Sequence, residues 1–89
     1  MAYKVEITKT AQRDLAQLDR PILEAMQKRI LRLAETADQI VHLPLTGQFA
    51  GLYKMRVRKD WRVIYDLQRE SELIVVVRVG HRREVYNDD

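Results

Sequence analysis

The sequence contains no cysteine, so it can form neither a disulfide framework nor a thiolate metal site, and a reducing compartment is compatible with it. The N-terminus lacks the apolar core of a secretory signal, and no apolar run approaches the length that spans a membrane. Repeats, low-complexity tracts and linker-like stretches are missing as well. A chain of 89 residues has room for one small core. We therefore expect a soluble, cytoplasmic protein with a single domain over residues 1–89.

The sequence also lacks the residues of two common kinds of hydrolytic site. Asp60, Asp66 and Glu84 do not form a spaced carboxylate cluster of the kind that binds catalytic metal ions. Ser71 has no histidine pattern near it that would activate it as a nucleophile. We expect an activity that uses no metal and no cofactor.

Positive charge, in contrast, is concentrated in one stretch. The formal net charge is only +3, from 16 Lys and Arg against 13 Asp and Glu. Residues 51–65 nevertheless hold a single acid, Asp60, among five cations: Lys54, Arg56, Arg58, Lys59 and Arg62. Clustered cations repel one another, and guanidinium groups match phosphates bidentately. This stretch therefore predicts contact with nucleic acid.

Hydrophobic periodicity predicts a short strand over residues 3–8 and then two helices. Ala11, Leu15 and Leu18 recur at helical spacing. Pro21 then starts a second helix, because proline fits the first turn, where its missing N–H costs nothing. Apolar residues follow the helical period over residues 22–37. The two helices form a hairpin whose apolar stripe faces the core.

Three further strands follow, separated by short polar turns, and are expected to pair as an antiparallel meander. The predicted fold is α+β, with an N-terminal strand, a two-helix hairpin and then a three- to four-stranded antiparallel meander. The helices pack on one sheet face, and the other face is left open. Leu43 and Leu45 are expected to tuck under the sheet in a crossing loop, because Pro44 excludes a helix there.

The alternation of residues 53–58 places Lys54, Arg56 and Arg58 on the open face. Arg62 joins them only if the loop before it has an odd number of residues. We predict a three-residue loop over residues 59–61, because a two-residue loop would bury an unpaired Arg62 guanidinium on the helix side.

Such a face suits metal-free RNA cleavage, in which the RNA supplies its own 2′-hydroxyl nucleophile. The reaction needs a base, a proton donor and cations around the phosphate. Repulsion from Arg56 favours the uncharged form of Lys54, which makes it a candidate base. Repulsion from Arg82 likewise favours the uncharged form of His81. This residue is either a second acid–base candidate or a surface turn residue.

The aromatic and remaining polar residues divide between core and surface. Strand phase favours core positions for Tyr53 and Tyr65, whereas Tyr86 lies outside the last apolar run and is predicted to contact RNA. His42, beside Pro44, is predicted to be structural. Three further RNA contacts are predicted on charge: Arg58, Lys59 and Arg83.

The order and spacing of these motifs resemble the RelE/ParE superfamily of type II toxins. The resemblance rests on Pro-Leu-Thr-Gly at residues 44–47, Gly-Leu-Tyr-Lys-Met-Arg-Val at residues 51–57 and Trp-Arg-Val-Ile-Tyr at residues 61–65. The ending Val-Gly-His-Arg-Arg-Glu-Val-Tyr, residues 79–86, resembles the RelE branch in particular.

The resemblance implies a ribosome-dependent endoribonuclease (an mRNA interferase) that cuts messenger RNA in the A site. It also implies silencing by a cognate antitoxin, in a hetero-oligomeric complex that binds DNA through the antitoxin. Lys54 and Arg56 match the family's base and phosphate ligands, Arg62 and Arg82 its arginines for transition-state stabilisation or proton donation, and Tyr86 its RNA-positioning tyrosine.

The sequence departs from the RelE pattern at two points. His81 stands where a lysine often sits, which leaves the acid–base assignment open. We expect the C-terminal helix of some relatives to be missing, so an antitoxin mechanism based on that helix is not transferred. Two alternatives to the nuclease stay open: a ParE-like toxin that inhibits DNA gyrase by binding, and an RNA-binding domain with an inert basic face.

Overall fold

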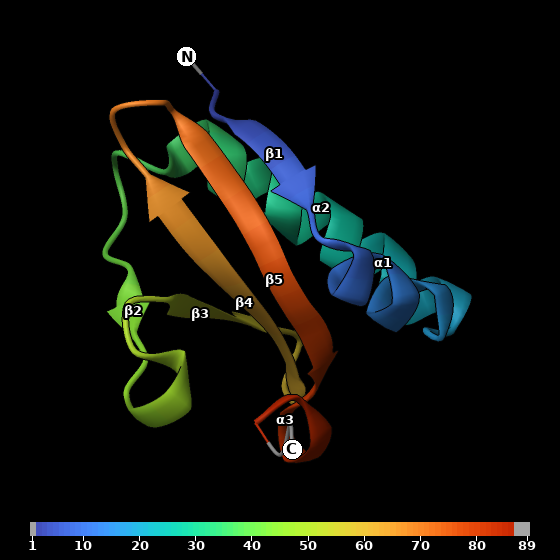
Figure 1. Ribbon diagram of the computed structural model, residues 1–89. Helices are drawn as coiled ribbons and strands as arrows, with labels where there is room; N and C mark the ends of the chain where they lie inside the picture. Colours follow the sequence, from blue (N-terminus) through green and yellow to red (C-terminus); the bar gives the residue numbers. More distant parts are fainter. Residues whose placement is uncertain (1, 87–89) are drawn as a thin grey trace.

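The sheet has five strands in the order β1-β5-β4-β3-β2, with the two longer helices on one of its faces (Figure 1). The computed structural model describes residues 2–86. In chain order the elements are β1 (Lys4–Ile7), α1 (Lys9–Ala16), α2 (Arg20–Thr36), β2 (Leu43–Pro44), the 3-10 helix η1 (Gly47–Phe49), β3 (Tyr53–Val57), β4 (Trp61–Gln68), β5 (Leu73–His81) and α3 (Arg82–Val85). The α+β class, the helix hairpin and the antiparallel β3-β4-β5 meander agree with the prediction.

The strand count differs from the prediction because both edges of the meander gain a strand. At one edge β1 pairs in parallel with β5, with Lys4 opposite Leu73 and Ile7 opposite Val76. At the other edge β2 pairs with β3 over two residues. The sheet is therefore mixed and five-stranded, with the predicted N-terminal strand at one edge and β2 at the other.

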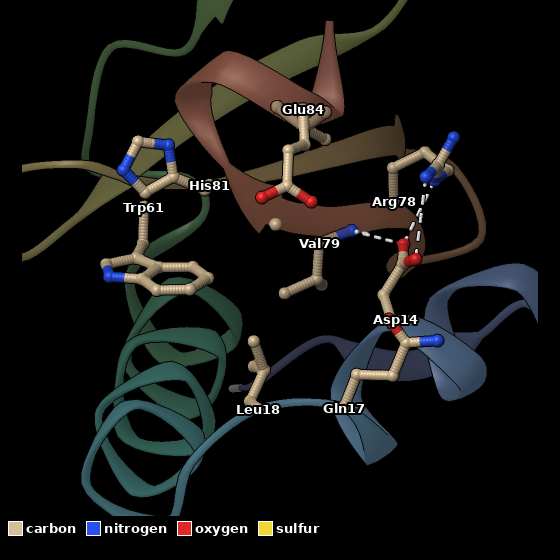
Figure 2. Close-up of a pocket in the computed structure, with 10 residues that line it drawn as sticks. Asp14, Gln17, Leu18, Trp61, Arg78, Val79, His81 and Glu84 are labelled. Carbon is tan, nitrogen blue, oxygen red and sulfur yellow. Dashed lines mark hydrogen bonds and ion pairs between the residues drawn. The ribbon is translucent and has the colours of Figure 1, made fainter. Parts of the chain in front are cut away.

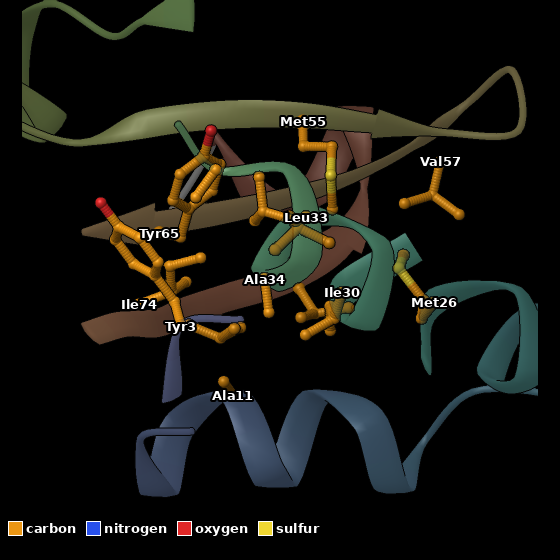
Figure 3. Packing of buried hydrophobic residues seen from close by; sticks show 14 residues of the cluster. Tyr3, Ala11, Met26, Ile30, Leu33, Ala34, Met55, Val57, Tyr65 and Ile74 are labelled. Carbon is orange, nitrogen blue, oxygen red and sulfur yellow. The ribbon is translucent and has the colours of Figure 1, made fainter. Parts of the chain in front are cut away.

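The helix hairpin begins and turns where the sequence predicts. The Thr8 hydroxyl accepts a hydrogen bond from the Ala11 N–H at 3.1 Å and so caps α1. Pro21 lies in the first turn of α2. Along α2, Met26, Ile30 and Leu33 are buried against the sheet (Figure 3). Each large apolar side chain buried in this way contributes about 1.5–3 kcal/mol to the free energy of unfolding.

His42 joins the end of the helix hairpin to the sheet. Its Nε2 lies 2.7 Å from the carbonyl oxygen of Ala37, which only accepts, so Nε2 carries the proton. Its Nδ1 then accepts from the Tyr65 hydroxyl, which is itself buried. Burial, with a smaller effect from neighbouring Tyr53, raises the pKa of Tyr65 to about 12. This geometry gives His42 and Tyr65 the structural roles that the sequence predicts.

Leu43 is not under the sheet, so that prediction is wrong. Leu43 lies in β2 opposite Lys54 and is 52% exposed, whereas Leu45 is half-buried. The physical reason is Pro44, which has no N–H to donate and therefore fits only an edge strand, with one flank in water.

The sheet face opposite the helix hairpin is partly covered, whereas the sequence predicts that it is left open. Ile64 shares that face with Lys54, its cross-strand partner, yet it is completely buried. α3 turns back at the end of β5, and a Cβ built at Gly80 would lie 3.6 Å from the Cβ of buried Val85. This separation is an ordinary van der Waals contact, so α3 packs against Gly80 through Val85 and covers part of this face.

No helix within residues 2–86 combines the length and the apolar character needed to cross a membrane.

Candidate active site

Three predicted site residues meet on the sheet face opposite the helices. In the β3-β4 ladder Arg56 lies directly opposite Arg62, and Lys54 lies opposite Ile64. Residues paired across a sheet share a face, so all three cations project from the same side. Arg62 also lies opposite Gly80 of β5, which has no side chain to crowd its guanidinium.

The turn between β3 and β4 has three residues, Arg58, Lys59 and Asp60. The odd number agrees with the prediction, but the turn begins one residue earlier than predicted, because Trp61 pairs with Val57. We call residues 58–60 the β3–β4 turn below.

Arg58 does not join the other cations, contrary to the prediction from strand phase. Its φ of 52° is in the left-handed region, which turns the chain out of the strand. Arg58 instead lines a surface pocket with Pro21, Glu24 and Lys28 of α2. Lys59 is exposed in the turn, and Arg83 is exposed in α3.

The β3–β4 turn and its neighbour hold the Arg62 guanidinium in place. Its Nη1 donates to the carbonyl oxygens of Lys59 at 3.1 Å and of Trp61 at 2.9 Å. Both acceptors are backbone oxygens, and within residues 2–86 no carboxylate pairs with the positive charge of Arg62. A half-buried cation of this kind is suited to an anionic ligand.

The same turn also holds Arg82, the first residue of α3. The Arg82 N–H donates to the carbonyl oxygen of Asp60 at 2.8 Å. The Arg82 Nε lies 3.4 Å from Oδ1 of Asp60, with both side chains about half exposed. Arg62 and Arg82, separated along the chain, are therefore brought to one end of the sheet by a single turn.

His81 is not brought together with these cations. It pairs with Trp61, and the two rings meet edge to face with centroids 5.4 Å apart. Both rings line a pocket of about 160 Å³ with Leu18 and Glu84, on the side of α1 (Figure 2). His81 Nδ1 accepts from the Arg83 N–H at 3.2 Å and so caps α3. In this arrangement His81 lies on the opposite face from Arg56 and Arg62, and its acid–base role stays a prediction.

Tyr86 is half-buried at the end of α3. Its hydroxyl oxygen is buried and has no hydrogen-bond partner within the part of the chain that the structure describes. Its carbonyl oxygen accepts from Gln48 Nε2 of η1 at 3.3 Å. The contact of Tyr86 with RNA stays a prediction.

We expect Tyr86→Phe to raise the free energy of unfolding by up to about 1 kcal/mol, because it removes a buried hydroxyl that has no partner among residues 2–86. Tyr65→Phe is the matched control, because it also removes a tyrosine hydroxyl oxygen, but one that donates a hydrogen bond to His42. This variant should lower the free energy of unfolding by about 1–2 kcal/mol. Urea unfolding of the three proteins measures both effects. A destabilised Tyr86→Phe variant would show that this hydroxyl has a partner in solution.

Comparison with known proteins identifies the fold and its class. The family model for the ParE toxin of type II toxin–antitoxin systems, parDE, matches residues 5–86, which is nearly the whole chain. The chain belongs to the RelE/ParE superfamily of type II toxins. This toxin is 34% identical over 86 residues to Toxin RelG of Mycobacterium tuberculosis, a match that covers 97% of this chain and 98% of RelG.

Solved structures of RelE proteins have the same fold as this toxin. In the RelBE2 toxin–antitoxin complex of M. tuberculosis, the matched chain is 34% identical with a TM-score of 0.79, covering 92% of this chain and 100% of that one. A mutant of Escherichia coli toxin RelE in the free state is 26% identical with a TM-score of 0.77, covering 97% and 92%. These matches confirm the fold class and the toxin family that the motifs predict.

Sequence reasoning missed one residue that the structure brings to the candidate site, Asp60. The only signal for it was its isolation, as the single acid among the five cations of residues 51–65. Its partner Arg82 lies in another element, so no local pattern could show the contact. Within residues 2–86, no group of three or more His, Asp or Glu side chains is arranged to hold a metal ion.

Proposed function

We propose that this toxin is a ribosome-dependent endoribonuclease that cleaves messenger RNA in the A site without a metal ion. The observation that supports it most is the convergence of cations on one face. Arg56 and Arg62 are cross-strand partners, Lys54 lies two residues along β3, and Arg82 is held at the adjoining turn. Three guanidinium groups and an amine can together surround one phosphate and its developing charge.

In the proposed reaction the RNA 2′-hydroxyl attacks the adjacent phosphorus. The bond from phosphorus to the 5′-oxygen breaks, which leaves a 2′,3′-cyclic phosphate and a 5′-hydroxyl. Lys54 takes the proton from the 2′-hydroxyl in its uncharged form, and Arg56 binds the phosphate. Arg62 and Arg82 stabilise the charge that builds on the phosphoryl oxygens. The proton for the leaving oxygen comes from Arg62 or Arg82. His81 lies on the opposite face and would have to move to act as the donor.

The partner that silences the enzyme is proposed to be a cognate antitoxin with an acidic or amphipathic segment. A groove of about 340 Å³ between α2 and the β3 edge has the matching surface. Exposed Ile40, Val41 and Leu43 line it together with cations that include Arg32 and Lys54. Such a segment would fold on binding. The resulting hetero-oligomer would bind DNA through the antitoxin, and the free toxin would act in the cytoplasm.

A ParE-like toxin, which inhibits DNA gyrase by binding and cuts no RNA, is the second candidate, because the matching family model carries the ParE name. The purified toxin should cleave messenger RNA on programmed ribosomes and leave gyrase supercoiling unchanged. Its expression alone should arrest growth, and co-expression of the neighbouring open reading frame should relieve the arrest. Gyrase inhibition with intact messenger RNA would establish the second candidate instead. Normal growth during soluble expression without a partner would contradict both.

A further inference from the structure

We infer that Asp60 is a positioning residue for cleavage, which orients the Arg82 guanidinium toward the scissile phosphate. This inference rests on the proposed function and deepens it. Asp60 contacts Arg82 twice, through its backbone oxygen at 2.8 Å from the Arg82 nitrogen and through Oδ1 at 3.4 Å from Nε. The first contact holds the start of α3 against the β3–β4 turn, and the second acts on the side chain alone.

The side-chain contact has a direction that suits phosphate binding. An arginine has five N–H donors, one on Nε and four on its two terminal nitrogens. Asp60 approaches from the Nε side, and within residues 2–86 the Arg82 guanidinium makes no other ion pair or hydrogen bond. The terminal nitrogens are thus left for a phosphate, whose oxygens pair with such a fork bidentately.

The Asp60 carboxylate should also weaken RNA binding. This effect distinguishes a positioning role from a purely structural one. Asp60 places a negative charge beside the cations that would attract RNA, so it weakens the docking of a polyanion. It also restricts a long, half-exposed side chain that would otherwise sample many rotamers. Removal of the charge should therefore improve binding and impair the chemical step, because Arg82 is less well oriented when the transition state forms.

The test is cleavage of messenger RNA on programmed ribosomes by Asp60→Asn, which keeps the backbone contact. Single-turnover rates are measured over a range of toxin concentrations, and kcat and KM denote here the limiting rate and the half-saturating concentration. We expect kcat to fall by about fivefold, the scale of one half-exposed ion pair. KM should fall by about twofold, because an acidic charge has left the RNA-facing surface. The melting temperature should not change. Asp60→Glu, which restores the carboxylate, should recover part of kcat.

Two further variants make the result specific. In an Arg82→Ala background, Asp60→Asn should leave the remaining rate unchanged, because a residue that acts through Arg82 has nothing left to orient. Glu70→Gln makes the same change of charge in the exposed turn before β5, and should behave as the wild type. An unchanged or raised kcat for Asp60→Asn, or an equal loss in both backgrounds, would overturn this inference alone. Failure of the wild-type toxin to cleave would overturn the proposed function and this inference with it.

Discussion

Arg82→Ala should lower the single-turnover cleavage rate on programmed ribosomes by on the order of a hundredfold or more, the scale of losing one preorganised charge donor. Arg82 begins α3 at the end of the sheet and is held at the same turn as Arg62. We expect it to meet the phosphate after RNA has docked on Lys54 and Arg56. Its contribution then belongs to the chemical step, where charge builds on the phosphoryl oxygens.

Binding and stability should separate this effect from a general loss of function. Ribosome affinity should fall much less than the rate, because Lys54, Arg56 and Arg62 remain on the same face. The melting temperature and antitoxin binding should barely change, because Arg82 is about half exposed and its ion pair contributes little to stability. Arg20→Ala, an exposed arginine paired with Glu24 on α2, is the matched control and should cleave at the wild-type rate. Poor binding with a wild-type rate would make Arg82 a docking contact only.

Affinity for ribosomes carrying messenger RNA should fall steeply as salt rises. Four cations in the candidate site, Lys54, Arg56, Arg62 and Arg82, can each neutralise a phosphate and release counterions. For single-stranded RNA each contact adds about −0.7 to the slope of log affinity against log salt. Four contacts then predict a loss of about 50-fold between about 50 and about 200 mM salt.

A substitution that removes one phosphate contact should change the slope of log affinity against log salt by a measurable amount. Arg56→Ala should reduce its magnitude by about 0.7, whereas Arg20→Ala should leave it unchanged, because Arg20 lies on α2 away from this face. Equilibrium binding measured at several salt concentrations gives both slopes. A flat salt response of the wild-type toxin would show that the cationic face is not the binding surface.

The sequence by itself determined the features that depend on periodicity within one element. Alternation along β3 separates Lys54 and Arg56 from Met55 and Val57, and the helical period of α2 buries Met26 and Leu33. The cost of burying an unpaired Arg62 was enough to require an odd turn before β4, because a slip by one residue turns every following side chain to the other face. The core role of Tyr65 followed from the same alternation.

Only the tertiary structure decided which face His81 occupies. The β4-β5 register shifts between Ile64 and Tyr65: Ile64 lies opposite Arg78 and Tyr65 opposite Val76, which leaves Val77 as an extra residue in β5. Such a bulge reverses the alternation beyond it, so His81 shares a face with Val79 and Trp61 rather than with Arg62. Nothing in residues 73–81 marks the bulge, because Val-Val-Val reads as a strand in either phase.

Contacts between distant segments were likewise invisible in the sequence. Residues 4–7 read as a strand, but their parallel partner β5 lies at the other end of the chain. Asp60 read as a lone acid in a basic stretch, and its contact with Arg82 exists only because β5 returns to the start of β4. Side-chain alternation is a local property that each segment carries in its own residues. Pairing, register and the meeting of charges depend instead on which segments the whole core brings together.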